Sequence, residues 1–587
     1  MSMDTSLLFP LTIFLPWIGA LAVLAVGRHG KFRTALAIGF AAADGLASLA
    51  LIPLAGTGTA FSVSLGGIFG NFSLVADGLG VFLAAVAAVV GCLAVVFSVD
   101  YMRGEEGLGR YYALVLFFIG SMVGLVLSSN LLMIVVFWEI TAFCSYALIS
   151  FHSDDPKAVA GGIKALIVTG LGGIGLLGGS FLIYAQIGSF DLQEFLAKAS
   201  QMRPVALAWV AFAFLAASAA KSAQFPFQTW LPDAMEAPTP ISALIHAATM
   251  VNAGVYLLAR VFPAFSGVTG WSTTVVMVGA ISALLAAVMA VASTDLKRVL
   301  AYSTVSQLGF MVFSIGAGGI FQSQFHLLSH SLFKALLFLG AGAVIHAVGT
   351  RDMREMGGLS RKMPLTCTVF ILGALALAGI PPVNGFWSKE LILEAGQLHA
   401  PSPAYLVMLA TVGLTALYSA RCVWMVFFAH PAAEPHAHEA GPAMQVALVP
   451  LAAGTLASWL LAGPFMSLLA RTLPLHFGPS PEIQSTWQIA QEVLLSPGTW
   501  LAMLVVAIGI VLWVLWRSFV PDPAKLAPAR KAAEAGLGFE TINRGITRAV
   551  QWTGEMLRTT QSGILNWNVA AIVMAVVAVM AVLAAGA

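Results

Sequence analysis

The sequence has 587 residues, of which 59% are hydrophobic and only 9% are charged. Soluble domains carry about 25% charged residues, so this composition excludes a soluble enzyme or a nucleic-acid-binding protein and indicates an integral membrane protein. The four cysteines form no C-x-x-C pair, which argues against disulfides and iron–sulfur ligation. The sequence therefore predicts no cofactor, no metal site and no catalytic centre of its own.

Apolar runs long enough to cross a bilayer, about 20 residues each, recur along the whole chain. The first run follows Asp4 and lacks a basic n-region, so we expect a retained helix and not a secretion signal. The fold class predicted is an all-α integral membrane protein. Its expected helices, about sixteen, lie near residues 6–27, 34–54, 76–99, 111–128, 131–151, 161–186, 206–231, 240–262, 272–293, 298–317, 322–348, 365–397, 404–429, 444–470, 498–518 and 566–586.

The basic residues predict the orientation of these helices. Nineteen of the 28 lysines and arginines, Lys297 and Arg298 among them, fall in the odd-numbered connections, and only four fall in the others. Because Lys and Arg are enriched in cytoplasmic loops, this bias places both termini on the outer side of the membrane.

Five charged residues interrupt the apolar runs: Glu139, Lys164, Lys221, Lys334 and Lys389. A charge at the centre of a bilayer costs about 2.5–3.5 kcal/mol on insertion scales, so such residues pair, face the protein interior or carry ions. The natural partner of the glutamate is Lys221 or Lys164. A static ion pair between two helices is the structural alternative to a switch that moves a proton.

Two of the predicted helices are expected to be broken. Pro226 and Pro232 follow Lys221, and Pro381 and Pro382 precede Lys389. Proline removes a backbone donor, and inside a membrane the freed carbonyls are tolerated only where protein or water satisfies them. Two such interruptions in corresponding halves are typical of transporters built from inverted repeats, although ordinary proline kinks are the alternative.

Histidines accompany the charges. His326, His330 and Lys334 are spaced at i, i+4 and i+8, which predicts one polar column some 12 Å long on a helix face. Histidine titrates near pH 6.5 and can therefore pass protons in either direction. His246 lies after the first break and could relay from Lys221 toward His326. Arg421 is interpreted as a helix-packing or interfacial charge.

Three long motifs identify a family resemblance. Residues 221–246 (KSAQFPFQTWLPDAMEAPTPISALIH), 295–309 (DLKRVLAYSTVSQLG) and 379–389 (GIPPVNGFWSK), with the histidine column, resemble the antiporter-like proton-conducting subunits of respiratory complex I, Mrp-type sodium/proton antiporters and energy-converting hydrogenases. The resemblance runs from about residue 70 to 430. It implies a fourteen-helix core of two inverted five-helix repeats, each containing a broken helix.

The resemblance also implies roles for single residues. Glu139 and Lys221 would be the switch pair of the first half-channel. Lys334 would be the central lysine of the second half-channel, and Lys389 its exit-side charge. The path expected from the residues themselves leads from Glu139 and Lys221 through Lys164 or His246 to the column at His326, His330 and Lys334. Gly170, Gly172 and Gly173 stand where some complex I subunits carry an extra charge, which favours an Mrp-like or hydrogenase-associated version.

The function expected from the residues and the resemblance is translocation of ions, with protons favoured, by one subunit of a larger pump or antiporter. Its partners would be other membrane subunits, including further antiporter-like subunits and a redox or Mrp module, in a bacterial or archaeal cytoplasmic membrane. A stand-alone Na⁺/H⁺ antiporter is one alternative, and it needs deep carboxylates, of which only Glu139 is expected. A scaffold subunit whose charges merely pair is the other.

The expected domain organisation follows the helices. A basic segment separates the last two of them, and Phe539, Ile542, Ile546 and Val550 share one helical face within it, although a plain linker is the alternative. The predicted parts are N-terminal helices (1–110), a first inverted repeat (111–262), a second inverted repeat (272–429), C-terminal helices (430–518), a basic amphipathic surface segment (519–565) and a terminal anchoring helix (566–587).

Overall fold

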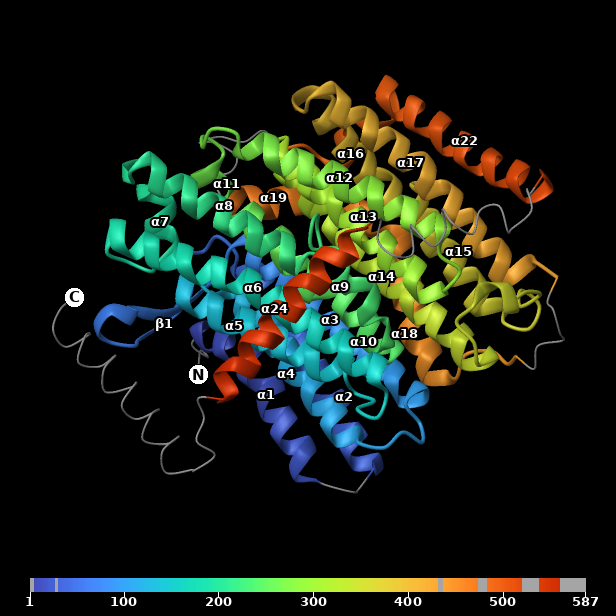
Figure 1. Cartoon of the computed structure of the whole chain (residues 1–587), viewed down its shortest axis with the longest axis horizontal. Helices are drawn as coiled ribbons and strands as arrows, with labels where there is room; N and C mark the ends of the chain where they lie inside the picture. Colours follow the sequence, from blue (N-terminus) through green and yellow to red (C-terminus); the bar gives the residue numbers. More distant parts are fainter. Residues whose placement is uncertain (1–4, 27–29, 431–436, 473–482, 520–537, 560–587) are drawn as a thin grey trace. The chain divides into compact units, whose positions relative to one another are not determined.

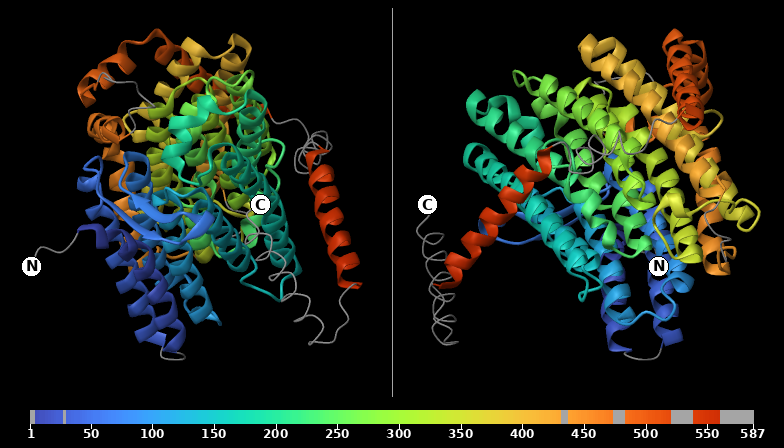
Figure 2. Two further views of the ribbon diagram at one scale, coloured as in Figure 1. Left: turned by 90° about the vertical axis from the view of Figure 1, so that its left-hand side faces the viewer. Right: turned by 45° about the vertical axis from the view of Figure 1, so that its right-hand side comes forward.

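The computed structural model describes residues 5–26, 30–430, 437–472, 483–519 and 538–559. The chain divides into two compact units, residues 1–537 and residues 538–587. Figure 1 shows the elements in chain order, and Figure 2 shows the same ribbon from two further directions.

The described part of the first unit is almost entirely helical. Its N-terminal half comprises α1 (Leu8–Ala25), α2 (Gly30–Ala50), β1 (Ala60–Ser64), β2 (Asn71–Val75), α3 (Gly78–Tyr101), α4 (Leu108–Leu127), α5 (Leu131–Ile149), α6 (Pro156–Ile187), α7 (Leu192–Lys198), α8 (Pro204–Lys221), α9 (Trp230–Asp233), α10 (Thr239–Ala243), the π-helical η6 (Leu244–Ala248) and α11 (Met250–Phe265). Its C-terminal half comprises α12 (Trp271–Ala292), α13 (Leu296–Gly316), α14 (Ile320–Val348), α15 (Pro364–Ala378), α16 (Asn384–His399), α17 (Ser402–Val423), the π-helical η8 (Trp424–Phe428), α18 (Pro442–Ala457), the 3₁₀-helical η9 (Ser458–Leu461), α19 (Ala462–Thr472), α21 (Thr486–Leu495) and α22 (Pro497–Phe519).

The predicted all-α membrane fold is confirmed. Fourteen helices of the described residues are long and apolar enough to cross a membrane, and each corresponds to a predicted span. The span expected near 365–397 is divided into α15 and α16. The span expected at 566–586 lies outside the described residues. The relation of the two repeats by inversion stays a prediction.

One feature of the fold was missed by the sequence patterns. Residues 60–75 form an antiparallel hairpin in which Ala60 pairs with Val75 and Ser64 pairs with Asn71. The side-chain amide of Asn130, which caps α5, donates to the carbonyl oxygens of Phe69 and Asn71 and so holds the hairpin to the helices.

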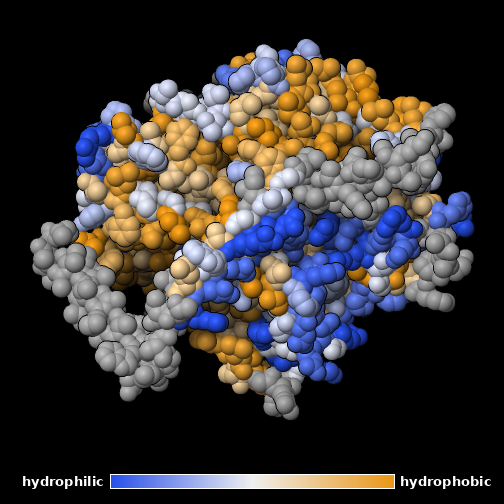
Figure 3. Space-filling model, in the orientation of Figure 1, coloured by the Kyte–Doolittle hydropathy of each residue, from blue (hydrophilic) through white to orange (hydrophobic). Residues whose placement is uncertain are grey.

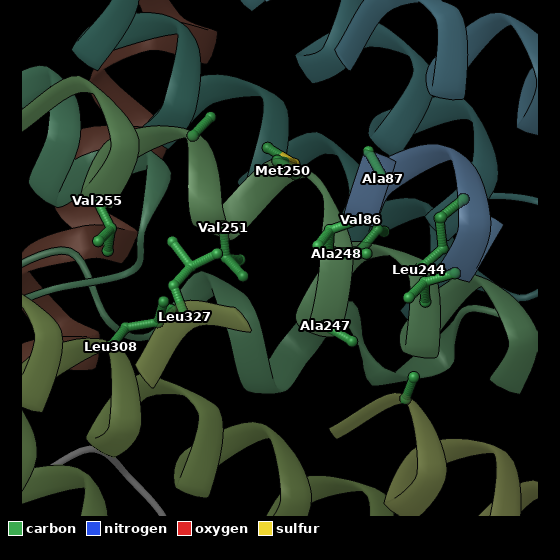
Figure 4. Packing of buried hydrophobic residues seen from close by; sticks show 14 of the residues in the cluster. Val86, Ala87, Leu244, Ala247, Ala248, Met250, Val251, Val255, Leu308 and Leu327 are labelled. Atoms are coloured by element: carbon green, nitrogen blue, oxygen red, sulfur yellow. The ribbon is translucent and has the colours of Figure 1, made fainter. Parts of the chain in front are cut away.

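Two segments are buried on every side, the helix from α10 through η6 to α11 and the helix α13. Helices buried in this way form the centre of the bundle. Figure 4 shows side chains from α3, η6, α11, α13 and α14 converging in one buried hydrophobic cluster. Ala247 and Ala248 are among them, and such small side chains let neighbouring backbones approach closely.

Both predicted helix breaks are confirmed. The chain leaves the α-helix between α8 and α9 and again between α15 and α16, and each interruption contains a cis peptide bond before proline, at Pro226 and Pro382. Each is tied by an indole: Trp230 Nε1 donates to Ala220 O at 2.9 Å, and Trp387 Nε1 donates to Pro382 O at 3.1 Å. Side chains of the protein thus satisfy backbone carbonyls that the breaks set free.

The helices α17 and α22 lie side by side, and hydrophobic residues dominate the surface above them in Figure 3. The exposed large apolar side chains of α22 include Trp500, Leu504 and Leu512. Such a surface matches a lipid environment.

In the second unit the described residues form α24 (Phe539–Thr559). It is a helix, as its apolar spacing predicts, and Arg544 pairs with Glu540 one turn away at 3.4 Å. The expected placement of this segment at the membrane surface stays a prediction.

Candidate ion-translocation site

Glu139 lies on α5, where one face is open at the surface of the chain. Val136 and Phe143, one turn to either side, are 45% and 54% exposed, and the glutamate itself is half-buried. Its carboxylate lies against α6, where a Cβ added to Gly173 would come 1.8 Å from Oε1. Oε1 is buried and has no hydrogen-bond partner among the described atoms. Gly173 is one of the glycines predicted to stand where related subunits carry a charge. Because it has no side chain, it leaves space for the carboxylate of Glu139 from the neighbouring helix.

Lys221 ends α8 at the first break and is fully buried. Its ammonium donates to Trp138 O at 2.7 Å and lies 4.8 Å from the centre of the Trp138 ring. Trp138 precedes Glu139 in the chain, and Lys221 and Glu139 are electrostatic neighbours. Among the described residues, however, no carboxylate oxygen lies within the 4.0 Å of an ion pair to Lys221. The two groups adjoin without touching.

Lys164 has a different partner from the one expected. Its ammonium lies 2.8 Å from Asp233 Oδ2 and donates to Thr229 O at 3.3 Å. The second oxygen of Asp233 is 3.2 Å from Arg298 Nη2. The lysine is therefore held by a carboxylate of the broken helix, which was not predicted, although Asp233 lies within the first motif.

His246 lies in the π-helical segment η6 and is fully buried. Neither ring nitrogen has a partner among the described atoms, and the ring lies 4.8 Å from that of Phe338. The wider π turn frees backbone carbonyls, which side chains then satisfy. Thr249 Oγ1 donates to Leu244 O at 2.7 Å, and Asn252 Nδ2 donates to Ala247 O at 2.8 Å.

The predicted polar column lies on α14, and all three members are fully buried. His326 contacts Gln307 Oε1 at 3.1 Å and Ser388 Oγ at 2.9 Å, and its ring centre is 6.4 Å from that of His330. Lys334 donates to Leu300 O at 3.2 Å and to the Ser303 hydroxyl. The nitrogens of His330 have no partner among the described atoms. Both ends of the column thus contact α13, as one helix face requires.

Lys389 follows the second break and is fully buried on α16. Its ammonium donates to Leu377 O at 2.6 Å and lies 5.6 Å from the centre of the Phe310 ring. Leu377 is near the end of α15, so Lys389 links α16 to α15 across the second break. Lys221 makes a similar link, from α8 to α5.

Among the described residues, three further carboxylates are more deeply buried than that of Glu139, those of Asp44, Asp77 and Glu390, so the expectation of a single deep acid was wrong. Asp44 on α2 is 0% exposed, and Glu390 on α16 is 4% exposed. Oε2 of Glu390 and both oxygens of Asp44 lack a partner among the described atoms. The apolar pattern of the sequence could not predict how deeply each acid is buried, because the helices that bury it are distant in sequence.

The assignment of Lys297 to a connection between helices was also wrong, whereas the side of the membrane on which it lies stays a prediction. It lies in the first turn of α13, is 3% exposed and donates to Ala237 O at 2.6 Å. A fifth lysine is therefore buried. Its neighbour Arg298, counted with it, is the cation that reaches Asp233.

A second group of ion pairs adjoins Lys297 at the end of α14. Arg351 lies 3.0 Å from Glu236 and 3.3 Å from Asp295. Partial burial acts to lower the pKa of Arg351, but the hydrogen bonds to Glu236 and the charge of Asp295 outweigh it, so this pKa is raised. These residues tie the segment after the first break to the beginning of α13 and to the residues that follow α14.

Arg421 contacts two carbonyl oxygens at the end of α12, those of Val291 and Ser293. The expected role in helix packing is thus consistent with a cation at a helix C-terminus. Among the described residues, no group of three or more His, Cys, Asp or Glu side chains could hold a metal ion.

Comparison with known proteins shows which families and proteins this chain resembles. Residues 128–417 match the family described as NADH:quinone oxidoreductase/Mrp antiporter, TM, and residues 63–112 match the N-terminus of chain 5 of NADH-ubiquinone oxidoreductase (complex I). Na(+)/H(+) antiporter subunit A1 of Staphylococcus haemolyticus is 42% identical over 414 residues, which are 65% of this chain and 51% of that protein. The corresponding Staphylococcus aureus subunit is 41% identical over 61% of this chain and 48% of its own length. The chain thus spans about half the length of these relatives.

Solved structures agree with the sequence comparison. A chain of the Mrp complex from Dietzia sp. DQ12-45-1b superposes with a TM-score of 0.79 and 29% identity, covering 100% of this chain and 63% of that one. A chain of an archaeal membrane-bound sulfane sulfur reductase gives a TM-score of 0.72 over 83% of this chain and 99% of that one, and at 23% identity it shows the fold alone. The chain therefore belongs to the family of antiporter-like membrane subunits found in complex I and Mrp antiporters.

Proposed function

We propose that this chain carries protons across the membrane as one subunit of a multisubunit cation/proton antiporter. The observation that carries the proposal is the surroundings of three buried lysines, Lys221, Lys334 and Lys389. Each donates to carbonyl or hydroxyl oxygens, and among the described residues none is within 4.0 Å of a carboxylate. A lysine held by neutral groups can exchange its proton without breaking an ion pair, as a relay requires.

The path follows these lysines. Protons enter beside Glu139 and Lys221, pass His246 and reach the column on α14, from which they leave past Lys389. The unpartnered nitrogens of His246 and His330 support this route, because buried polar atoms need hydrogen-bond partners and water is the available one. Coupling is electrostatic: a charge that moves at one site changes the affinity of the next site for its proton.

The exposed face around Glu139 supports a partner subunit. A half-buried carboxylate between two exposed apolar side chains would face lipid in a free chain, at the cost noted for charges inside a bilayer. A second membrane subunit packed on Val136 and Phe143 removes that cost. The relatives are named Na(+)/H(+) antiporter subunits, which favours an Mrp-type assembly over a redox-driven one.

The test is proton transport by the assembled complex in everted membrane vesicles, followed with a pH-sensitive dye after sodium is added. Lys334→Ala is expected to lower the rate by at least about tenfold, since positioned acid–base groups contribute 10²–10⁴-fold to proton transfer. Leu332→Ala, on the same helix but lining an apolar cavity, is the control and retains transport. Unchanged transport in Lys334→Ala would favour a scaffold role.

A stand-alone antiporter is the second candidate, and the buried carboxylates Asp44 and Glu390 are the observation in its favour. The two proposals differ for the single chain purified into vesicles. We expect no sodium-dependent proton flux there, and such a flux would replace the subunit proposal with the stand-alone one.

A further inference from the structure

Five lysines are buried among the described residues, and they differ in what their ammonium groups contact. Lys221, Lys297, Lys334 and Lys389 donate to carbonyl or hydroxyl oxygens. Lys164 is the one whose described contacts include a carboxylate, at 2.8 Å from Asp233. Residue type and position in an apolar run did not distinguish it from Lys221, Lys334 and Lys389.

Asp233 is the centre of this arrangement. One of its oxygens lies 2.8 Å from Lys164 of α6, and the other lies 3.2 Å from Arg298 of α13. Lys164 also donates to Thr229 O, just before α9. The short helix α9, which completes the broken helix, is therefore held from two sides by fixed cations.

The position of α9 bears directly on Lys221. The indole of Trp230, the first residue of α9, donates to the carbonyl of Ala220, the residue before Lys221. Lys221 in turn donates to the carbonyl of Trp138, the residue before Glu139. Three hydrogen bonds, joined by short stretches of backbone, thus connect Lys164 through Asp233 and α9 to Lys221 and to the residue before Glu139.

An ammonium in such a pair is poorly placed to relay protons. Deprotonation of Lys164 would take away one of the two cations that hold the Asp233 carboxylate, and a carboxylate oxygen that loses its cation at a partly buried site costs free energy. The lysines with neutral surroundings carry no such constraint.

We propose that Lys164 is a permanently charged positioning residue, which places Lys221 through Asp233 and α9 and does not itself pass protons. This inference rests on the proposed function and revises the row of relay groups expected from the sequence. Asp233 and Arg298 are positioning residues of the same unit.

Arginine separates a fixed cation from a relay, because it pairs with carboxylates but does not deprotonate in proteins. In the assembled complex, Lys164→Arg is expected to transport protons within about twofold of the parent rate, whereas Lys164→Gln falls by roughly tenfold. Lys221→Arg is expected to be inactive, with equal amounts of complex co-purifying in each case. An assembled but inactive Lys164→Arg would overturn the inference, and an active Lys221→Arg would instead overturn the proposed relay.

A second pair of variants tests the same point if arginine does not assemble. Lys164→Gln leaves Asp233 with one cation fewer, and combining it with Asp233→Asn removes the carboxylate that needs it. The double variant is therefore expected to transport at least about threefold faster than Lys164→Gln, since contacting residues are not additive. A relay role predicts that the double variant is no faster than the single one, and that result would overturn the inference.

The pH profile gives a readout that a positioning role does not move. Lys164→Gln is expected to lower the maximal rate while leaving the pH of half-maximal transport unchanged. A shifted midpoint with normal assembly would place Lys164 among the titrating groups and contradict the inference.

Discussion

At the scale of single residues, the charge that a side chain carries was predictable, but its partner was not. Glu139 was expected to pair with Lys221 or Lys164, and in the structure the first adjoins it without an ion pair while the second is held by Asp233. Charges stand out in an apolar run because each one is costly there. Pairing depends on which helices pack together, and no local pattern carries that information.

The variant Gly173→Ala tests whether transport depends on the position of the Glu139 carboxylate. A Cβ at residue 173 would lie 1.8 Å from Glu139 Oε1, so Gly173→Ala must displace the carboxylate. Transport by the complex is expected to fall by about tenfold or more, and overpacking of this kind costs about 1–3 kcal/mol of stability.

Gly178 on the same helix is the matched control, because a Cβ added there meets nothing within 4 Å. Gly178→Ala is expected to match the parent in transport rate and in thermal unfolding of the purified complex. Equal transport by Gly173→Ala would show that the carboxylate does not need its present position.

At the scale of elements, composition predicted where helices lie and where two of them break. Proline beside a buried lysine was a sufficient signal in both cases, and the structure interrupts both helices there. The π-helical turn at His246 had no such signal. Its residues are ordinary helix formers, and the turn depends on the Thr249 and Asn252 side chains that satisfy its carbonyls.

The variant Thr249→Val tests whether the π-helical turn depends on the hydrogen bond that Thr249 donates. Thr249→Val keeps the shape of the side chain but removes the hydrogen bond to Leu244 O, and a buried carbonyl left unpaired costs about 1–3 kcal/mol. We expect lower thermal stability of the complex and slower transport, because His246 lies in the disturbed turn.

Thr274→Val is the control, since the partly exposed Thr274 makes the same type of bond to Gly270 O at 2.8 Å on α12. Water replaces that bond, so transport is expected to be unchanged. Equal effects in the two variants would mean that the π turn is held by packing alone.

At the scale of the whole molecule, α13 joins the two halves. Its residues accept hydrogen bonds from the first break, where Gln224 Nε2 donates to Val305 O at 3.3 Å. They also hold the column on α14 through Gln307 and Ser303. A change of charge in either half-channel therefore meets the same buried helix, which gives a physical route for coupling between them.

The assembled complex is expected to cover the Glu139 face. A photo-reactive phenylalanine analogue in place of Phe143, which is 54% exposed, should cross-link to another polypeptide in the complex. The same analogue at Phe214, which is 0% exposed, should give only cross-links within the chain. Lipid adducts alone at Phe143 would contradict a partner subunit at this face.

Composition and periodicity decided the fold class, fourteen membrane-length helices of the described residues and both breaks, because lipid requires long apolar helices and penalises every exception to them. The Glu, Lys and His residues of the proposed ion path could be picked out from the sequence for the same reason, because polar and charged side chains are costly inside apolar helices. Tertiary packing alone decided which charges meet, that Lys164 is anchored by Asp233, and that Lys297 and Glu390 are buried. These contacts join helices far apart in the chain, and their energies depend on distances that no local sequence pattern contains.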